Sequence, residues 1–230
     1  MTLWTPVSTG RSSARVWRGE GIHRKEGPVA EIADEAARLA WLAAHGIPCP
    51  KIVEHSPGHL VTTTVPGRPA SDLGPAVAPA IGTLLRALHA VPVAACPFDR
   101  RLAVTIREAE ARAAAGLVDL GNLDAERVGW SSARLIAELH ATRPATEDLV
   151  VGHGDLCLPN ILADEAGHIT GVVDVGRLGA TDRHNDLAIA TRDLAARWSD
   201  AAAARFLAAY GVPEPDPAKI AFYRLLDEFF

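Results

Sequence analysis

Apolar and polar residues are interleaved in short runs over the first part of the chain, a pattern typical of strands and tight turns. A longer segment at 31–46 is rich in Ala, Leu and Glu, and it ends at Gly46, where a helix C-terminus favours glycine. One helix is therefore expected among the strands. Pro57 and Gly58 indicate a hairpin turn, as do the glycines at 19 and 21. The expected strands are 14–19, 21–27, 51–56 and 59–65.

Beyond a Pro- and Gly-rich segment at 66–75, apolar residues recur mainly with helical spacing. Ile81, Leu84, Leu85 and Leu88 give the clearest example, because they fall on one face of a helix. The later part of the chain is therefore expected to be mainly helical. Helices are expected at 77–91, 101–116, 131–141, 185–198, 200–211 and 216–230.

The segment 150–177 breaks this helical pattern, because two short β-like runs flank a turn at 165–167. It indicates a hairpin placed inside the helical part. The sequence thus predicts an α+β protein with two lobes joined through the Pro- and Gly-rich segment. The small, β-rich N-lobe is expected at 1–65 and the larger, mainly helical C-lobe at 66–230.

Composition narrows the class of protein. Hydrophobic residues make up 48% of the chain and charged residues 22%, the balance of a soluble globular protein. The net charge of -5 and the scattered Lys and Arg residues argue against a nucleic-acid partner. No run approaches the roughly 20 apolar residues of a membrane span, and no leader pattern is seen, so we expect a cytoplasmic protein. Cys49, Cys96 and Cys157 are too far apart to indicate a zinc site or a disulfide framework.

Three polar residues interrupt the apolar runs of the hairpin segment at a fixed spacing. Asn160 follows Asp155 by five positions, and Asp174 follows Asn160 by fourteen. Carboxylate and amide oxygens on two sides of a hairpin suit Mg²⁺, which prefers oxygen ligands and keeps waters and substrate phosphates. Protein kinases have this layout, with a catalytic-loop Asp, an Asn five residues later and a metal-binding Asp after a strand. The spacing favours Asp155 as the catalytic residue and Asn160 and Asp174 as metal ligands.

Taken singly, these residues also fit ordinary structural roles. Asp155 could cap a turn, and Asn160 could hydrogen-bond its own backbone. His153 is expected to be a buried, satisfied histidine in preference to a proton shuttle. The joint spacing is what favours the functional interpretation.

A kinase-like site also needs a cation for the nucleotide phosphates, and the chain has only three lysines. Lys25 lies in the second expected strand, shortly before the helix that carries Glu31 and Glu35. Glu35 is the better partner for a Lys–Glu ion pair, because Leu39 and Leu42 follow it at helical spacing and turn that face inward. A solvated surface lysine is the alternative.

The loop over the phosphates is expected at 8–16, between the N-terminus and the first of these strands. Its backbone amides and the hydroxyls of Ser12 and Ser13 could bind phosphate oxygens. With one glycine, the segment also fits an ordinary turn.

Four segments together resemble the bacterial aminoglycoside 3'-phosphotransferases, the kanamycin and neomycin kinases that confer antibiotic resistance. The likeness covers most of the chain from residue 33 onward. It implies a protein-kinase-like two-lobed fold and ATP-dependent transfer of a γ-phosphoryl group to the 3'-hydroxyl of an aminoglycoside. The segments are HGDLCLPN, VVDVGRLGATDRHNDLAIATRD, CPFDRR and AFYRLLDEFF.

The resemblance also implies roles in nucleotide binding. Asp155 would orient the hydroxyl and accept its proton, while Asn160 and Asp174 would hold Mg²⁺. Lys25 would contact the phosphates of ATP. The segment TTTVPG matches the hinge of the family, so backbone groups of Thr63 and Val65 would meet the adenine.

Substrate recognition is expected at the chain end, where carboxylates would complement the ammonium groups of the drug. Asp227, Glu228 and the carboxylate of Phe230 are the strongest of these, although a solvated acidic tail is the alternative. Family positions near the drug are further occupied by Asn122, Asp124, Arg192 and Asp193.

Two further positions bear on substrate recognition. Ala125 stands where the family usually has Glu, which removes one ammonium contact. Arg177, just past Asp174, is expected to hold the loop or a phosphate.

Several other functions fit parts of this pattern. A kinase of the same fold could act on streptomycin at its 3''-hydroxyl, on a macrolide or on a choline-type substrate. A nucleotide-binding module without turnover would not need the full set of Asp155, Asn160, Asp174 and Lys25, and a metal hydrolase would need more His ligands than His153 and His168. We expect a monomer or a weak dimer, with no membrane partner.

Overall fold

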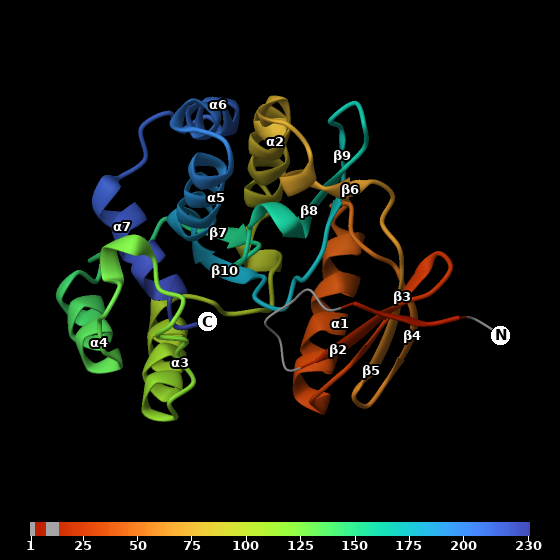
Figure 1. Cartoon of the computed structure of the whole chain (residues 1–230), viewed down its shortest axis with the longest axis horizontal. Coiled ribbons are helices and arrows are strands. Elements are labelled where there is room, and N and C mark those ends of the chain that lie inside the picture. The colour runs from red at the N-terminus through yellow and green to blue at the C-terminus, as the bar shows by residue number, and fades with distance from the viewer. Residues whose placement is uncertain (1–2, 8–13) are drawn as a thin grey trace.

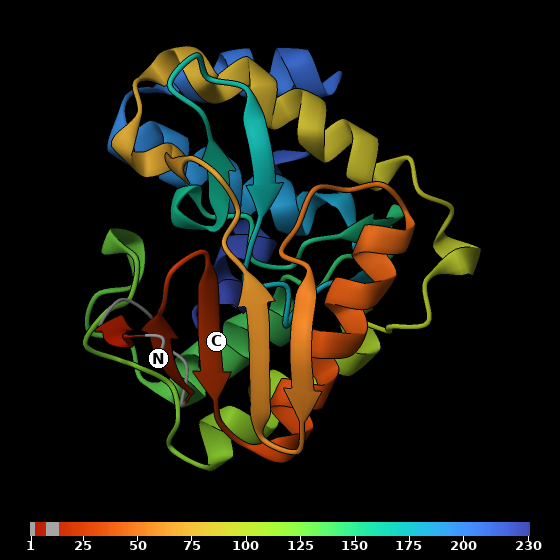
Figure 2. The ribbon, with the colours of Figure 1, turned by 90° about the vertical axis from the view of Figure 1, so that its right-hand side faces the viewer.

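The four strands expected in the first lobe, together with an unpredicted β1, form one antiparallel sheet. The computed structural model describes residues 3–7 and 14–230. The sheet has five strands in the order β1-β2-β3-β5-β4 and carries one helix, α1, against one side (Figures 1 and 2). The bounds are β1 Thr5–Val7, β2 Arg15–Arg18, β3 Ile22–Glu26, α1 Val29–Ala44, β4 Ile52–Ser56 and β5 His59–Thr63.

Helix α1 packs on the sheet through the apolar face that its sequence pattern predicts. Ile32, Ala36, Leu39 and Leu42 are buried and recur every three or four residues, so they share one side of the helix. The central strand β3 places Lys25 opposite Val16 of β2 and Leu60 of β5. The sheet therefore positions Lys25 at a fixed point of the N-lobe.

The C-lobe is mainly helical, as expected. Helix α5 lies among α2, α6 and α7, and it is buried along most of its length (Figure 1). The sequence of α5 is less apolar than the sequences of the neighbouring helices, although α5 is buried. Its buried polar residues are therefore expected to have hydrogen-bond or ion-pair partners. The helices are α2 Ala78–His89, α3 Leu102–Ala114, α4 Ser132–Ala141, α5 Arg183–Arg197, α6 Asp200–Tyr210 and α7 Pro217–Asp227.

The expected hairpin after residue 150 is present as β8 (Ile161–Ala163) and β9 (Ile169–Val172). Two features of this region were not predicted. A two-residue strand, β6 (Arg68–Pro69), extends the hairpin to three strands, and β7 (Leu149–Gly152) pairs with β10 (Gly179–Asp182). These strands are short and their partners lie far away in the sequence, so no local pattern marks them.

Two buried apolar clusters form the core, and one of them joins the lobes. The first includes Leu42 of α1, Leu85 of α2 and Phe206 of α6, and thus joins the helix of the N-lobe to the C-lobe. The second includes Leu139 of α4 and Phe222 of α7. No described helix is long and apolar enough to cross a membrane. The three cysteines are free thiols.

A buried arginine adds a polar link between α1 and the C-lobe. Arg38 is 8% exposed, and its Nε donates to the carbonyl of Leu178 at 2.9 Å. The guanidinium also lies 4.7 Å from the ring centre of Phe98. Helix α1 is therefore fixed to the segment that follows Asp174 as well as to its own sheet.

Asp182, at the end of β10, is a buried junction between three elements. Its carboxylate is fully buried and accepts hydrogen bonds from Lys219 of α7 (2.6 Å), the backbone of Asp148 (2.9 Å) and the His184 ring (2.7 Å). Burial alone would raise the pKa of Asp182, but the hydrogen bonds from His184 and Lys219 lower it to about 2. The junction ties the start of α7 to the start of α5.

This shift predicts a pH-dependent part of the stability. A carboxyl whose pKa is lower in the folded state stabilises the protein above its unfolded pKa, and this stabilisation disappears as the pH falls toward 2. Between pH 5 and pH 3 the loss should be about 1 kcal/mol. Urea unfolding at the two pH values should therefore show a smaller decrease for Asp182→Asn than for the unchanged protein. The exposed Asp200→Asn is the control, and equal decreases in all three proteins would contradict the prediction.

Candidate active site

The three polar residues of the hairpin segment lie together. Asp155 follows β7, and Asn160 ends a single 3-10 turn that leads into β8. The Asn160 side-chain amide donates to the Asp155 backbone carbonyl at 3.0 Å and to its carboxylate Oδ2 at 3.2 Å. Across the hairpin, Val173 donates its N–H to the Asn160 carbonyl at 2.9 Å, which places Asp174 beside Asn160.

His153 is buried and hydrogen-bonded, as the sequence predicts. It is fully buried, and its Nδ1 accepts the backbone N–H of Asp155 at 3.3 Å. Because Nδ1 accepts, the ring proton is on Nε2, which donates to the carbonyl of Val173 at 3.1 Å. His153 thus joins the Asp155 loop to the residue before Asp174, and neither ring nitrogen is left for proton transfer.

The loop that carries Asp155 is also held from behind by a carboxylate that the sequence analysis missed. Asp186 of α5 is fully buried and accepts the backbone N–H groups of His153 (2.7 Å) and Gly154 (2.8 Å). Burial would raise the pKa of Asp186, but hydrogen bonds and the nearby histidines lower it, so it remains a carboxylate. An Asp inside the apolar run NDLAIA was the available signal.

Gly154 permits a close approach between this loop and the one that follows Asp174. Its φ is +84°, and a Cβ at this position would lie 2.3 Å from the carbonyl oxygen of Arg177. Any other residue would therefore be strained and would also push the two loops apart. The segments that carry Asp155 and Asp174 are therefore packed as one unit.

Lys25 forms the expected ion pair with Glu35. Its Nζ lies 2.7 Å from Glu35 Oε2 and 3.4 Å from Asp174 Oδ1, and the Lys25 side chain is 18% exposed. Burial would lower the pKa of Lys25, but Glu35 and Asp174 raise it, so the ammonium stays charged. The N-lobe thus places a cation directly at Asp174 of the C-lobe.

The oxygen donors present here fit a magnesium ion. Because the Asn160 amide nitrogen donates to Asp155, its Oδ1 remains available as a ligand. The Asp174 side chain is 51% exposed and can offer its carboxylate. No group of three or more His, Cys, Asp or Glu residues suited to a metal occurs in the described part of the chain. In kinases, Mg²⁺ is typically held by two protein oxygens, and waters and phosphates complete its coordination.

The expected adenine contacts lie where β5 leaves the sheet. Thr63 donates its N–H to the carbonyl of Lys51 at 2.9 Å, and Thr64 donates to Gly21 at 2.8 Å. The Val65 N–H, just past the end of β5, has no backbone partner within the described residues. Ser12 and Ser13, expected over the phosphates, lie outside the described residues.

Asp227, at the end of α7, links two arginines of the C-lobe. Its Oδ1 lies 3.1 Å from Arg177, and its Oδ2 lies 2.7 Å from Arg192. Arg192 also lies 3.5 Å from Asp124. Arg177 thus holds the loop after Asp174, one of the two roles expected for it. The ion pairs of Asp227 with Arg177 and Arg192 therefore connect the segment after Asp174 to the expected substrate site.

Glu228 is brought to the same region, but its carboxylate points inward. The side chain is 5% exposed, and its Oε1 lies 3.2 Å from Arg127 and accepts the Asp124 N–H at 3.1 Å. Arg127 is a buried arginine that the sequence analysis missed, because its partner is about a hundred residues away. Glu228 and Arg127 therefore fix the position of Asp124, whose own side chain is 29% exposed.

The other expected substrate residues differ in their surroundings. Asp193 accepts the N–H of Leu158 at 3.1 Å, and its pKa is raised by burial. Asn122 lies on an exposed turn after α3. Three guanidiniums surround the ring of Phe230, those of Arg100 and Arg112 at 5.7 Å and that of Arg177 at 5.0 Å.

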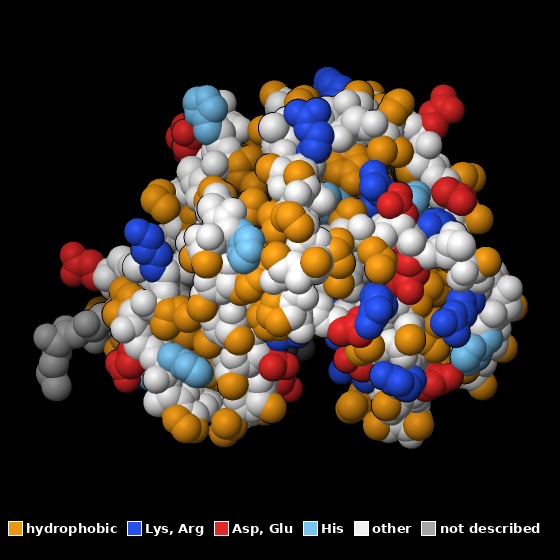
Figure 3. All heavy atoms as spheres, turned by 180° about the vertical axis from the view of Figure 1, so that it is seen from behind, with side chains coloured by type: hydrophobic (Ala, Val, Ile, Leu, Met, Phe, Trp, Pro, Cys, Tyr) orange, Lys and Arg blue, Asp and Glu red, His pale blue; other side chains and the backbone are white. Residues whose placement is uncertain are grey.

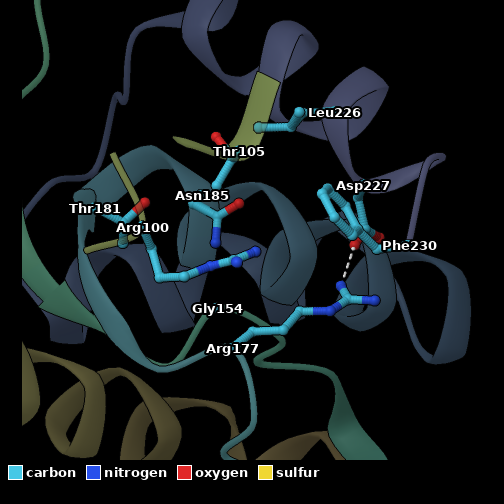
Figure 4. Close-up of a pocket in the computed structure, with 9 residues that line it drawn as sticks. All are labelled: Arg100, Thr105, Gly154, Arg177, Thr181, Asn185, Leu226, Asp227 and Phe230. Atoms are coloured by element: carbon cyan, nitrogen blue, oxygen red, sulfur yellow. Dashed lines mark hydrogen bonds and ion pairs between the residues drawn. The ribbon is translucent and has the colours of Figure 1, made fainter. Parts of the chain in front are cut away.

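A pocket opens beside the catalytic loop and Phe230 (Figure 4). Arg100 and Arg177 both extend into it, and Arg177 bonds to Asp227 at its edge. Seen from behind, the molecule is hollowed between the N-lobe and the part formed by α3 and α4 (Figure 3). The end of the chain lies close to α3 in Figure 1.

A lysine paired with a glutamate on the small lobe, facing an Asp, an Asn and a second Asp on the large lobe, defines a kinase. The chain belongs to the phosphotransferase enzyme family, whose model matches residues 4–223.

Known proteins of this family are similar over nearly the whole chain. The chain is 45% identical to an aminoglycoside 3'-phosphotransferase of Streptomyces fradiae, covering 99% of this chain and 95% of that protein. It is 40% identical to a streptomycin 3''-kinase of Streptomyces griseus, covering 97% and 91%. The crystal structure of an aminoglycoside-3'-phosphotransferase of type VIII matches with a TM-score of 0.90 and 45% identity, covering 100% and 94%. A phosphotransferase from Streptomyces rimosus in complex with ADP and streptomycin matches at 0.87 and 30%, covering 98% and 92%.

Proposed function

We propose that this protein transfers the γ-phosphoryl group of ATP to the 3'-hydroxyl of an aminoglycoside antibiotic, with Mg²⁺, and thereby confers resistance. The observation that carries the proposal is the meeting of Lys25 and Asp174 at 3.4 Å from opposite lobes, next to Asp155 and Asn160. The similarity to aminoglycoside 3'-phosphotransferases supports the choice of substrate. We assign residues 1–65 to the nucleotide-binding lobe and 66–230 to the catalytic and drug-binding lobe.

Each residue of the site has a defined role in this reaction. Asp155 orients the 3'-hydroxyl and accepts its proton, because its carboxylate is fixed by Asn160 and its loop by Asp186. Lys25 binds the phosphates, and the Thr63 carbonyl and Val65 amide bind adenine. Mg²⁺, held by Asn160 and Asp174, would neutralise the charge of the phosphates.

The charge of the substrate pocket supports a polycationic ligand. Asp124, Asp193 and Asp227 gather around Arg192, and Glu228 and Arg127 hold Asp124 in position. The two arginines bound to Asp227 reduce the local negative charge, so ammonium groups would compete with Arg177 and Arg192 for this carboxylate. This competition favours ligands with several closely spaced ammonium groups.

A streptomycin 3''-kinase is the second candidate, because a relative of that name is 40% identical over nearly the whole chain. Drug-dependent ADP release with Mg²⁺ and ATP separates the two functions. The acceptors are kanamycin, a related aminoglycoside without a 3'-hydroxyl, and streptomycin. Turnover with kanamycin alone is expected. Turnover with streptomycin alone would replace the proposal with the 3''-kinase, and no turnover with any acceptor would overturn both.

Lys25→Met should raise the KM for ATP by about tenfold or more, because a charge-assisted contact to phosphate is worth roughly 1.5–3 kcal/mol. The KM for kanamycin should change much less. Initial rates measured at varied ATP and fixed kanamycin, and then the reverse, test this. Lys51→Met is the matched control, since Lys51 is exposed. An unchanged KM for ATP would remove Lys25 from the nucleotide site.

A further inference from the structure

Asp186, which holds the catalytic loop, has a second set of partners on its other side. His89, the last residue of α2, places its Nε2 3.0 Å from Asp186 Oδ2. Its Nδ1 lies 2.8 Å from the hydroxyl of Tyr210, the last residue of α6. The His89 side chain is 4% exposed, and Tyr210 is also 4% exposed. A continuous buried chain of hydrogen bonds therefore leads from α6 through α2 and α5 to the loop of Asp155.

The direction of each hydrogen bond follows from the charge of Asp186. An ionised carboxylate can only accept, so His89 Nε2 carries a proton and donates to it. When the ring is neutral, Nδ1 is an acceptor, and the Tyr210 hydroxyl donates to it. Tyr210 thereby selects the tautomer of His89 that donates to Asp186. Histidines bound to metals are fixed by an outer partner in the same way.

We propose that His89 and Tyr210 are positioning residues for phosphoryl transfer, which set the orientation of Asp186 and, through it, the position of Asp155. The proposal rests on the proposed function. Of Asp186, His89 and Tyr210, Asp186 is the residue that contacts the loop of Asp155. His89 holds the Asp186 carboxylate from the side opposite to that loop.

Two further observations support positioning in preference to simple packing. A Cβ on Gly152 would lie 2.9 Å from Asp186 Oδ2, so the backbone before the catalytic loop is fitted closely around this carboxylate. Asp186 uses both oxygens for adjacent N–H groups of the loop, at 2.7 Å and 2.8 Å. A rotation of the carboxylate would therefore shift both N–H groups together and move Asp155 from its position.

The test compares three variants with the unchanged protein. His89→Leu removes the donor to Asp186, and it should lower kcat for kanamycin phosphorylation by about tenfold to a hundredfold with KM values nearly unchanged. His89→Gln keeps an N–H donor at the same reach and should recover most of the loss. Tyr210→Phe removes only the outer hydrogen bond and should lower kcat by about threefold.

A second measurement does not depend on the substrate. Hydrogen exchange of the segment around His153 and Gly154 should be faster in His89→Leu. Leu88→Ala is the control for lost stability, because Leu88 is a buried apolar residue of α2 next to His89. When the variants are compared at equal global stability, Leu88→Ala should have nearly normal local exchange and kcat. Unchanged exchange and kcat in His89→Leu, or an equal loss in Leu88→Ala, would overturn the positioning role. Absence of turnover in the unchanged protein would instead refute the proposed function, while the exchange result would still decide the role of His89.

Discussion

Asp155→Asn should lower kcat for phosphoryl transfer by at least about 100-fold, because general bases contribute roughly 10²–10⁴-fold and an amide cannot accept the hydroxyl proton. The substitution keeps the shape of the side chain and an oxygen that can still accept from Asn160, now 3.2 Å from Asp155 Oδ2. The fold and the binding of nucleotide should therefore be retained. The KM for both substrates should change little, since only the transition-state interaction is lost.

Steady-state kinetics with kanamycin, together with MgADP binding by calorimetry, measures both parts of this result. Asp164→Asn is the matched control, because Asp164 lies at the turn of the same hairpin and bonds only to residues of that turn. It should have nearly normal kcat. A kcat for Asp155→Asn within a few-fold of the unchanged protein would show that another group accepts the proton.

Asp174→Asn should reduce turnover at low Mg²⁺ by about 100-fold or more, because the charged oxygen ligand of the metal is replaced by a neutral one. Asp174 has a φ of +57°, and it is the only described residue other than glycine with a positive φ. Asn tolerates this left-handed backbone about as well as Asp does, so the substitution changes the charge without adding strain.

The dependence of rate on metal concentration separates binding from chemistry. The midpoint of a Mg²⁺ titration should move to higher concentration in Asp174→Asn, and part of the lost rate should return near saturation. The thermal midpoint of the metal-free protein should change little, apart from loss of the Lys25 contact at 3.4 Å. An unaltered Mg²⁺ midpoint would exclude Asp174 as a metal ligand.

The central residues of the site could be predicted because their relation is local. Asn160 and Asp174 lie at the two ends of one hairpin, so the pairing of β8 with β9 brings them together, and Asp155 lies only five positions before Asn160. The pairing of Lys25 with Glu35 could also be predicted, because a strand and the next helix have few ways to pack. Most helices follow from apolar spacing in the same way.

Contacts between distant segments could not be predicted. Arg127 reaches Glu228 across 101 positions, and His89 reaches Asp186 across 97. Nothing in either local sequence says which buried charges will meet, because that depends on how α2, α5 and α7 pack. The sequence therefore indicated Glu228 as a carboxylate of the substrate site, but not that its side chain is turned toward Arg127.

The bond from Arg38 to the carbonyl of Leu178 constrains how the two lobes can move. A swing of the whole N-lobe would leave this buried pair without partners, at a cost of roughly 1–3 kcal/mol. Helix α1 is thus attached to both lobes, because its apolar face packs on the sheet while Arg38 bonds to the C-lobe. Opening of the nucleotide site therefore requires either that this hydrogen bond breaks or that the five-stranded sheet bends while α1 stays in place.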